Sequence, residues 1–196
     1  NQKFVIGMVG TNCYVVYNEN TKECFVVDPA APSAPLVEFI QTEGLQLQGI
    51  LLTHGHFDHI MGIDTLRREW SVPVYASALE QKVLTDANVN LSVAYGAGYV
   101  FADAKFLEDG ASLALAGYQI RMISTPGAYG GRMLLLYRRR GGSFQRRYTV
   151  CRLCWKNRFS DRQYEYTGAF GKRAIAEPSG RYAGVSGTYG GNNDRI

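Results

Sequence analysis

All three histidines of this 196-residue chain lie within six residues, directly after a short apolar run. The run "GILLT" (49–53) is short and continuously apolar, which predicts a strand buried on both faces. His54 and His56 are separated by a single glycine, so in an extended chain both imidazoles project to the same side. Asp58 and His59 follow where the chain turns toward a helix. Any fold of this chain must therefore present these side chains together at the end of a buried strand.

The spacing of these residues favours a metal site. Neutral imidazoles together with a carboxylate suit zinc, and a zinc site left open to water lowers the pKa of that water to about 7. The alternative is a polar loop whose histidines cap a helix or face solvent. Four potential ligands in six residues, with no histidine elsewhere, favour the metal. We therefore predict the metal ligands His54, His56, Asp58 and His59.

Hydrophobic periodicity around this loop alternates between strand and helix. Strands are predicted at 3–9, 13–17, 24–28, 49–53 and 73–77, and helices at 33–44, 60–70 and 77–84. Residues 88–104 have no firm period and are predicted as a loop, and 111–127 as a hairpin that runs into a buried strand. The alternation predicts an α/β chain with a layered, sheet-rich (α+β) arrangement.

The charge balance changes abruptly after residue 127. Residues 1–127 carry 7 Lys and Arg against 13 Asp and Glu, a net charge of −6, whereas residues 128–196 carry 14 against 4, a net charge of +10. Twelve of those 14 basic residues are arginine. No helical or strand period persists in this second region. The sequence therefore predicts two regions, 1–127 and a basic Arg/Gly-rich tail, 128–196.

Composition also limits where the protein acts. No apolar run approaches the roughly 18 residues that a membrane span needs, and no charged segment followed by an apolar one resembles a signal peptide. Four cysteines do not make a disulfide scaffold in a chain of this length, and Cys13 and Cys24 fall in predicted strands, where we expect them to be buried. We therefore expect a cytoplasmic protein that has no membrane partner.

The first region resembles a known family. "THGHFDH" matches the Thr-His-x-His-x-Asp-His signature of the metallo-β-lactamase fold hydrolases in full. "TNCYVVY" (11–17), "VVDPA" (26–30) and "STPG" (124–127) are similar to further landmarks of that family, in the same order. The similarity is strongest to the glyoxalase II-like (hydroxyacylglutathione hydrolase-like) branch and covers residues 1–127. The resemblance implies an αββα sandwich with a dinuclear metal site at the sheet edge.

The resemblance also implies a role for each residue of the loop. His54 and His56 belong to a first metal, and Asp58 and His59 to a second. Two zinc ions, or iron or manganese in their place, share a hydroxide that attacks a carbonyl carbon and stabilise the resulting oxyanion. Asp58 is also the catalytic residue that orients the hydroxide. The implied partner is a small-molecule substrate, a thioester such as a glutathione conjugate of a hydroxy acid, with lactam hydrolysis and phosphodiester cleavage as alternatives.

Three ligands of the family pattern are absent from the tail. The family has a His directly after "TPG", an Asp in a Ser-Gly-Asp turn and a late His in a Pro-Gly-His turn, whereas position 128 is Ala and no later residue is His. Back-translation with one base omitted near codon 127 restores all three in family order, at codons 128–129, 147–148 and 188–189. We therefore expect that 128–196 is a frame-shifted reading of the C-terminal half. On this account the chain does not form the second half of the fold and is inactive.

A different interpretation of the tail is a basic module that binds nucleic acid. "YRRRGG", "QRRY" and "WKNRFSDRQYEY" interleave arginine with aromatic residues, as nucleic-acid-binding surfaces can. The absence of any period argues against such a module, so we do not expect nucleic acid to be a partner. The pair Cys151 and Cys154 is by itself a weak zinc or redox signal, and we interpret it as an accident of frame.

Overall fold

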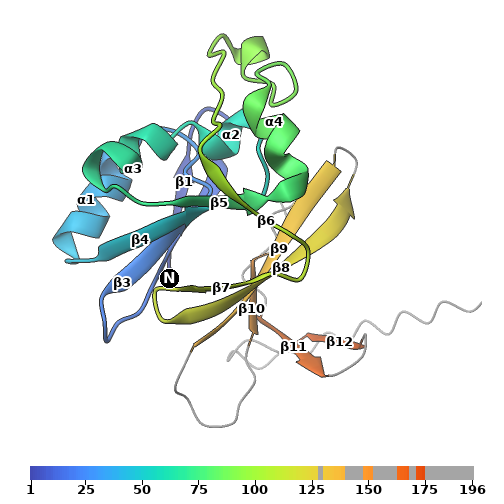
Figure 1. Ribbon diagram of the computed structural model, residues 1–196. Helices are drawn as coiled ribbons and strands as arrows, with labels where there is room; N and C mark the ends of the chain where they lie inside the picture. The colour runs from blue at the N-terminus through green and yellow to red at the C-terminus, as the bar shows by residue number, and fades with distance from the viewer. Residues whose placement is uncertain (128–129, 140–147, 152–162, 168–170, 175–196) are drawn as a thin grey trace, which may run out of the picture.

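The computed structural model describes residues 1–127, 130–139, 148–151, 163–167 and 171–174, with side chains described up to residue 123. Two sheets, each of six described strands, lie one against the other (Figure 1). The first contains, in order, β1 (Gln2–Ile6), β2 (Thr11–Tyr17), β3 (Glu23–Val27), β4 (Gln46–Leu51), β5 (Val74–Ser77) and β6 (Ala104–Leu107). The second contains β7 (Ser112–Leu115), β8 (Tyr118–Gly127), β9 (Gly130–Arg139), β10 (Tyr148–Cys151), β11 (Gln163–Thr167) and β12 (Gly171–Ala174).

The described helices all belong to the connections of the first sheet. They are α1 (Ala34–Thr42), α2 (Phe57–Ile60), α3 (Ile63–Glu69) and α4 (Gln81–Thr85), with short 3-10 helices η1 (Ala78–Glu80) and η2 (Val93–Tyr95). α1 begins at the predicted N-cap Ser33, whose Oγ accepts a hydrogen bond from the Leu36 amide at 3.4 Å. Among these helices, none is long and apolar enough to cross a lipid bilayer.

β4 lies in the middle of the first sheet and is buried on both faces. It pairs in parallel with β3 on one side and β5 on the other. Ile50 packs in the core between the sheet and the helices, and Leu51 packs in the core between the two sheets. Burial of both faces explains why residues 49–53 form a continuous apolar run rather than an alternating one.

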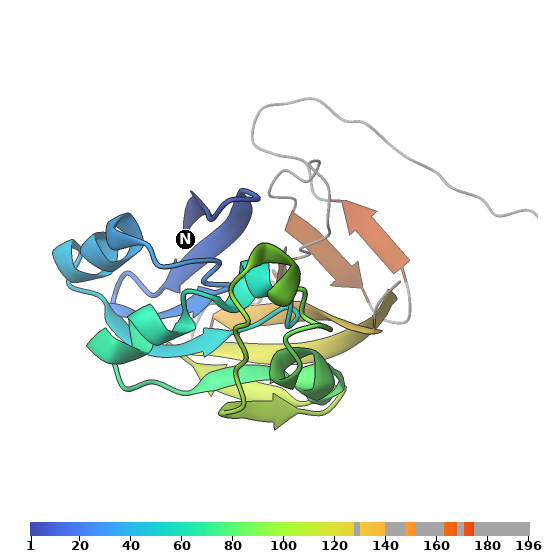
Figure 2. The same cartoon turned by 90° about the horizontal axis from the view of Figure 1, so that it is seen from above.

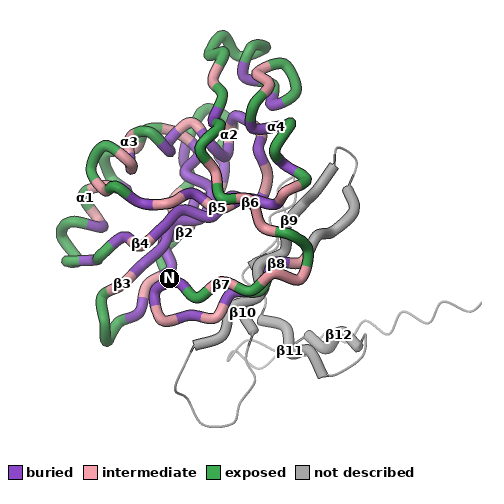
Figure 3. Tube along the Cα trace, in the orientation of Figure 1, coloured by how far each residue is buried: buried purple, intermediate pink, exposed green. Residues whose placement is uncertain are grey.

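The layers confirm the predicted α/β class. α1 and α3 cover one face of the first sheet and the second sheet covers the other, so the central strands are buried and the outer turns of these helices are exposed (Figures 1 and 3). Tyr118 on β8 fastens the two sheets, because its hydroxyl donates a hydrogen bond to the Tyr17 carbonyl at 3.0 Å. The helical layer that the resemblance implies on the outer face of the second sheet is a prediction that falls on residues other than those described.

The single helix predicted at 60–70 is two helices, and at the break the chain bonds to a neighbouring loop instead of to its own preceding turn. Gly62 lies between α2 and α3, and its amide donates to the Pro29 carbonyl at 2.7 Å. A Cβ at this position would lie 2.6 Å from the carbonyl oxygens of Pro29 and Ala31. The chain therefore turns here in close contact with the loop that follows β3. The strand β6 was not predicted, because it adjoins the segment interpreted as a loop and none of its four residues is fully buried.

Described strands continue past residue 127, while the prediction that the tail does not complete the second half of the fold stays a prediction. β9 forms a long antiparallel hairpin with β8, and β10, β11 and β12 extend the same sheet. β9 contains the apolar run 133–136, in a region whose sequence shows no persistent strand period. The remainder of 128–196 lies outside the described residues, and its origin in a shifted frame stays a prediction.

Substitution of Gly62 by alanine should destabilise the protein, because the methyl group meets two backbone carbonyls that cannot move aside. We expect Gly62→Ala to lower the free energy of unfolding by roughly 2 kcal/mol, which is typical of overpacking at a rigid site. The control Glu69→Ala, at an exposed position of α3, should change it by less than about 0.5 kcal/mol. Urea unfolding measures both, and equal effects would contradict the close contact at Gly62.

Candidate metal centre

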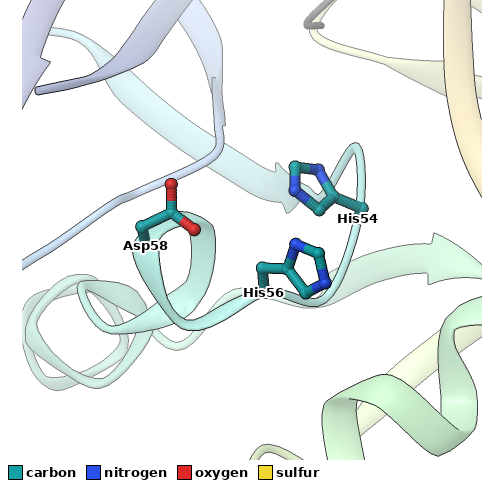
Figure 4. A group of neighbouring side chains, drawn as sticks. All are labelled: His54, His56 and Asp58. Carbon is teal, nitrogen blue, oxygen red and sulfur yellow. The ribbon is translucent and has the colours of Figure 1, made fainter. Parts of the chain in front are cut away.

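The histidine loop leaves the carboxyl end of β4 and leads into α2. His54 and His56 project from the loop and Asp58 from the first turn of α2, toward a common space (Figure 4). One potential ligand atom from each of the three lies within 4.8 Å of those of the other two. The rings of His54 and His56 meet edge to face, with their centroids 4.8 Å apart. Three of the four predicted ligands are therefore gathered in one group.

His59 lies beside this group and not within it. Its ring centroid is 3.8 Å from that of His54. Its Nδ1 lies 2.9 Å from Oδ2 of Asp28, and its Nε2 lies 3.4 Å from Oδ2 of Asp58. His59 is therefore held between two carboxylates, one behind it in the core and one facing the other predicted ligands.

Asp28 fixes the start of the loop from the end of β3. Its side chain is completely buried, and it takes a left-handed backbone conformation with a φ of 52°. Oδ1 accepts a hydrogen bond from the Thr53 amide at 2.7 Å, and Oδ2 accepts one from the Thr53 hydroxyl at 2.6 Å. These two hydrogen bonds and the ion pair with His59 stabilise a carboxylate that would be costly to bury alone. Sequence reasoning did not assign Asp28 to the site, although an Asp at the end of an apolar strand was a visible signal.

Glu80 fixes the middle of the loop from the opposite side. This side chain, at the end of η1, is 2% exposed, and its Oε2 accepts a hydrogen bond from the Gly55 amide at 2.7 Å. Burial raises the pKa of the Glu80 carboxyl to about 7, against the opposing effect of the Gly55 hydrogen bond. Glu80 was also missed, because nothing in the predicted helix 77–84 distinguishes it from a solvated glutamate.

The segment 86–99 supports the loop where α2 begins. The Phe57 amide donates to the Asn90 carbonyl at 2.9 Å, and the Phe57 ring stacks on Tyr95 with centroids 4.2 Å apart. This places η2 beside α2 (Figure 2). Asn90 and Ser92 are completely buried, and each side chain donates to the Tyr99 carbonyl. The segment predicted as a plain loop is therefore internally hydrogen-bonded.

The protonation states of Asp58 and His59 depend on each other. Burial alone would raise the pKa of the Asp58 carboxyl, but hydrogen bonds from His59 and Thr11 and the charge of His59 hold it at about 2. Burial alone would lower the pKa of His59, but the charges and hydrogen bonds of Asp28 and Asp58 raise it to about 9. In the metal-free protein, His59 is therefore an imidazolium that provides positive charge between the two carboxylates.

This donor set fits a divalent metal. Two imidazoles and an ionised carboxylate are ligand types that zinc and iron accept. His59 presents Nε2 toward Asp58 and is fixed at Nδ1 by Asp28, as metal-binding histidines usually are by a carboxylate. A metal at Nε2 would have to displace the proton that the two carboxylates stabilise.

The His59 pKa predicts how the metal-free protein responds to pH. Between the ordinary pKa of 6.5 and the raised value of about 9, folded His59 binds more proton than unfolded His59. The stabilisation from its ion pairs is thus complete below pH 6.5 and is lost as the pH rises toward 9. In the presence of a chelator, urea unfolding should show a falling free energy over this range, and His59→Gln should flatten the curve. A wild-type stability that stays constant or rises over this range would contradict the assignment.

Comparison with known proteins agrees with this geometry. The family model described as "Metallo-beta-lactamase superfamily" matches residues 6–141. The "Probable metallo-hydrolase YqgX" of Bacillus subtilis is 30% identical over 128 residues, which are 64% of this chain and 60% of that protein. The "Hydroxyacylglutathione hydrolase GloC" of Haemophilus influenzae is 27% identical over 119 residues, 59% of this chain and 56% of that protein. The chain thus spans about three fifths of the length of these relatives.

Solved structures give the same result. A crystal structure titled "BLEG-1 B3 metallo-beta-lactamase" has a TM-score of 0.64 and 32% identity, with 69% of this chain and 66% of that chain covered. "TTHA1623 in a di-iron-bound form" has a TM-score of 0.56 and 25% identity over the same shares. With the family match over more than half of its length and the histidine loop at the end of β4, this chain belongs to the metallo-beta-lactamase superfamily, whose members are metal-dependent hydrolases.

Proposed function

We propose that this chain derives from a thioester hydrolase of the hydroxyacylglutathione type that uses two zinc ions. The observation that carries the proposal is the convergence of the potential ligand atoms of His54, His56 and Asp58 within 4.8 Å of one another. His54 and His56 are assigned to the first ion, and Asp58 and His59 to the second. A metal bound here supplies a Lewis acid that lowers the pKa of water and stabilises developing negative charge on a carbonyl oxygen.

Asp58 has the properties that a ligand with a second, orienting role requires. Its carboxylate stays ionised at neutral pH, because its pKa lies near 2. The Thr11 hydroxyl donates to Oδ2 at 2.8 Å and so fixes the rotation of the carboxylate from β2. A fixed, ionised carboxylate beside the histidines can accept a hydrogen bond from an attacking water and so orient it. This supports the role of Asp58 as the catalytic residue.

The choice of a thioester substrate is supported by relatives from several bacteria. GloC and the "Hydroxyacylglutathione hydrolase" of Bdellovibrio bacteriovorus, the latter 35% identical over 75 residues, have this activity in their names. The second candidate is β-lactam hydrolysis, which is favoured by the 32% identity to the B3 metallo-beta-lactamase structure. Iron in place of zinc is supported by the di-iron neighbour.

We further propose that the ligands missing from this chain were lost through a one-base shift near codon 127. The family match ends at residue 141, so residues 142–196, where two of the three restored ligands would lie, are outside it. Without the later ligands each metal has only two of the protein ligands proposed for it, one fewer than catalytic zinc sites use. The chain as it stands is accordingly inactive, and the arginine-rich tail has no nucleic-acid partner.

The substrate proposal is tested on protein made from the gene with one base removed near codon 127. We expect kcat/KM for S-lactoylglutathione to exceed that for nitrocefin. Asp58→Asn should lower the turnover of either substrate by roughly 100-fold or more, because it removes both a ligand charge and the orienting group. Faster hydrolysis of nitrocefin would make the protein a lactamase. A metal-loaded protein that hydrolyses neither would overturn the hydrolase proposal.

A further inference from the structure

We infer that Glu80 is a positioning residue, which fixes the directions of the His54 and His56 imidazoles through the backbone of the glycine between them. The inference rests on the proposed metal site, because it assigns Glu80 a purpose there without making it a ligand. Glu80 acts through the Gly55 amide, which donates a hydrogen bond to its Oε2.

The hydrogen bond from the Gly55 amide to the Glu80 carboxyl is short and buried. The N to Oε2 distance is 2.7 Å, and both groups are buried. A buried amide that loses its acceptor is left unsatisfied, which is costly, so the bond resists opening. Glycine has the greatest backbone freedom of any residue, so an unfixed Gly55 would allow its flanking peptides to rotate and the two imidazoles to separate. The Glu80 carboxylate removes that freedom.

Packing against α4 restricts Gly55 to the same position. A Cβ on Gly55 would lie 3.0 Å from Cγ of Leu84, 3.1 Å from the Leu84 amide nitrogen and 3.1 Å from Cγ1 of Val83. Leu84 is completely buried and its backbone belongs to a helix, so this surface does not yield easily. Glu80 and α4 are consecutive in the chain. The η1–α4 segment therefore provides both the contact surface and the hydrogen-bond acceptor that hold the glycine.

The opposite end of the loop is held by Asp28 through Thr53. Residues 53–56 are consequently fixed at two alternate amides by two buried carboxylates that come from different elements. In an extended stretch, the side chains of 54 and 56 share one direction only while the peptide planes between them stay aligned. Fixing the amides of Thr53 and Gly55 keeps that alignment, which is the arrangement that brings the two imidazoles to one metal.

The simpler alternative is that Glu80 only stabilises η1 and α4. Two substitutions separate the alternatives by reach and by charge. Glu80→Asp keeps the charge but shortens the side chain, so that its carboxylate no longer reaches Gly55. Glu80→Gln keeps the reach and a carbonyl acceptor but loses the charge. The matched control is Ser77→Ala, which removes the Oγ that accepts from the Leu79 amide at 3.3 Å and so loosens η1 without touching the loop.

Two measurements on the full chain apply. Hydrogen exchange of the Gly55 amide, followed by NMR in metal-free protein, reports the hydrogen bond directly. Titration with Co²⁺, followed by visible absorbance, reports the affinity and geometry of the His54, His56 and Asp58 group. We expect Glu80→Asp to speed Gly55 exchange and to weaken Co²⁺ binding by about tenfold with an altered spectrum. Glu80→Gln and Ser77→Ala should both stay close to the unaltered chain.

Slow exchange of the Gly55 amide in Glu80→Asp would overturn the inference. Loss of Co²⁺ affinity in Glu80→Gln but not in Glu80→Asp would also overturn it, because the charge of the side chain and not its reach would then matter. An equal loss of affinity in Ser77→Ala would reduce Glu80 to a structural role. Absence of any Co²⁺ signal from the unaltered chain would count against the proposed metal site instead. In that case the Gly55 exchange rates, which need no metal, still decide whether Glu80 fixes the loop.

Discussion

The hydrogen bonds between Thr53 and the buried Asp28 carboxylate are the interaction on which the rest of this structure depends. Asp28 is completely buried, so its carboxylate must be satisfied by protein donors, and the Thr53 amide and hydroxyl supply two of them. This pairing joins the end of β3 to the end of β4. It determines where the histidine loop leaves the sheet, and the third contact of Asp28 holds His59 beside the same loop.

The parts of the site that follow local rules could be predicted from the sequence. The spacing of His54, His56 and Asp58 needs only an extended stretch and one helical turn to bring the three together, and the structure does so. Asp28 and Glu80 were not predicted, because each binds a loop residue that is 25 positions away in the chain. Parallel strand pairing and helix packing bring these distant residues together. Likewise the break at position 62 depends on contact with a distant loop, and no helical period could reveal it.

The structure describes more of the second sheet than composition and periodicity predicted. Its first two strands supply Leu115, Tyr118, Ile120 and Met122, which cover the face of the first sheet that α1 and α3 leave open. Leu51 of β4 is buried only because that cover exists. The sequence of the tail shows no persistent strand period, yet β9 pairs with β8 in an antiparallel hairpin. Forming strands and supplying metal ligands are separate requirements. Under the frameshift proposal, the tail can form strands although it does not supply the later metal ligands.

Metal stoichiometry tests this account most directly. Protein made from the present gene and protein made from a gene with one base removed near codon 127 would be dialysed side by side and analysed for zinc, iron and manganese. The account predicts clearly less than two ions per chain in the first, which has only the loop ligands, and two in the second, which regains its later ligands. Two tightly held ions in the present chain, or no gain after removal of the base, would contradict it.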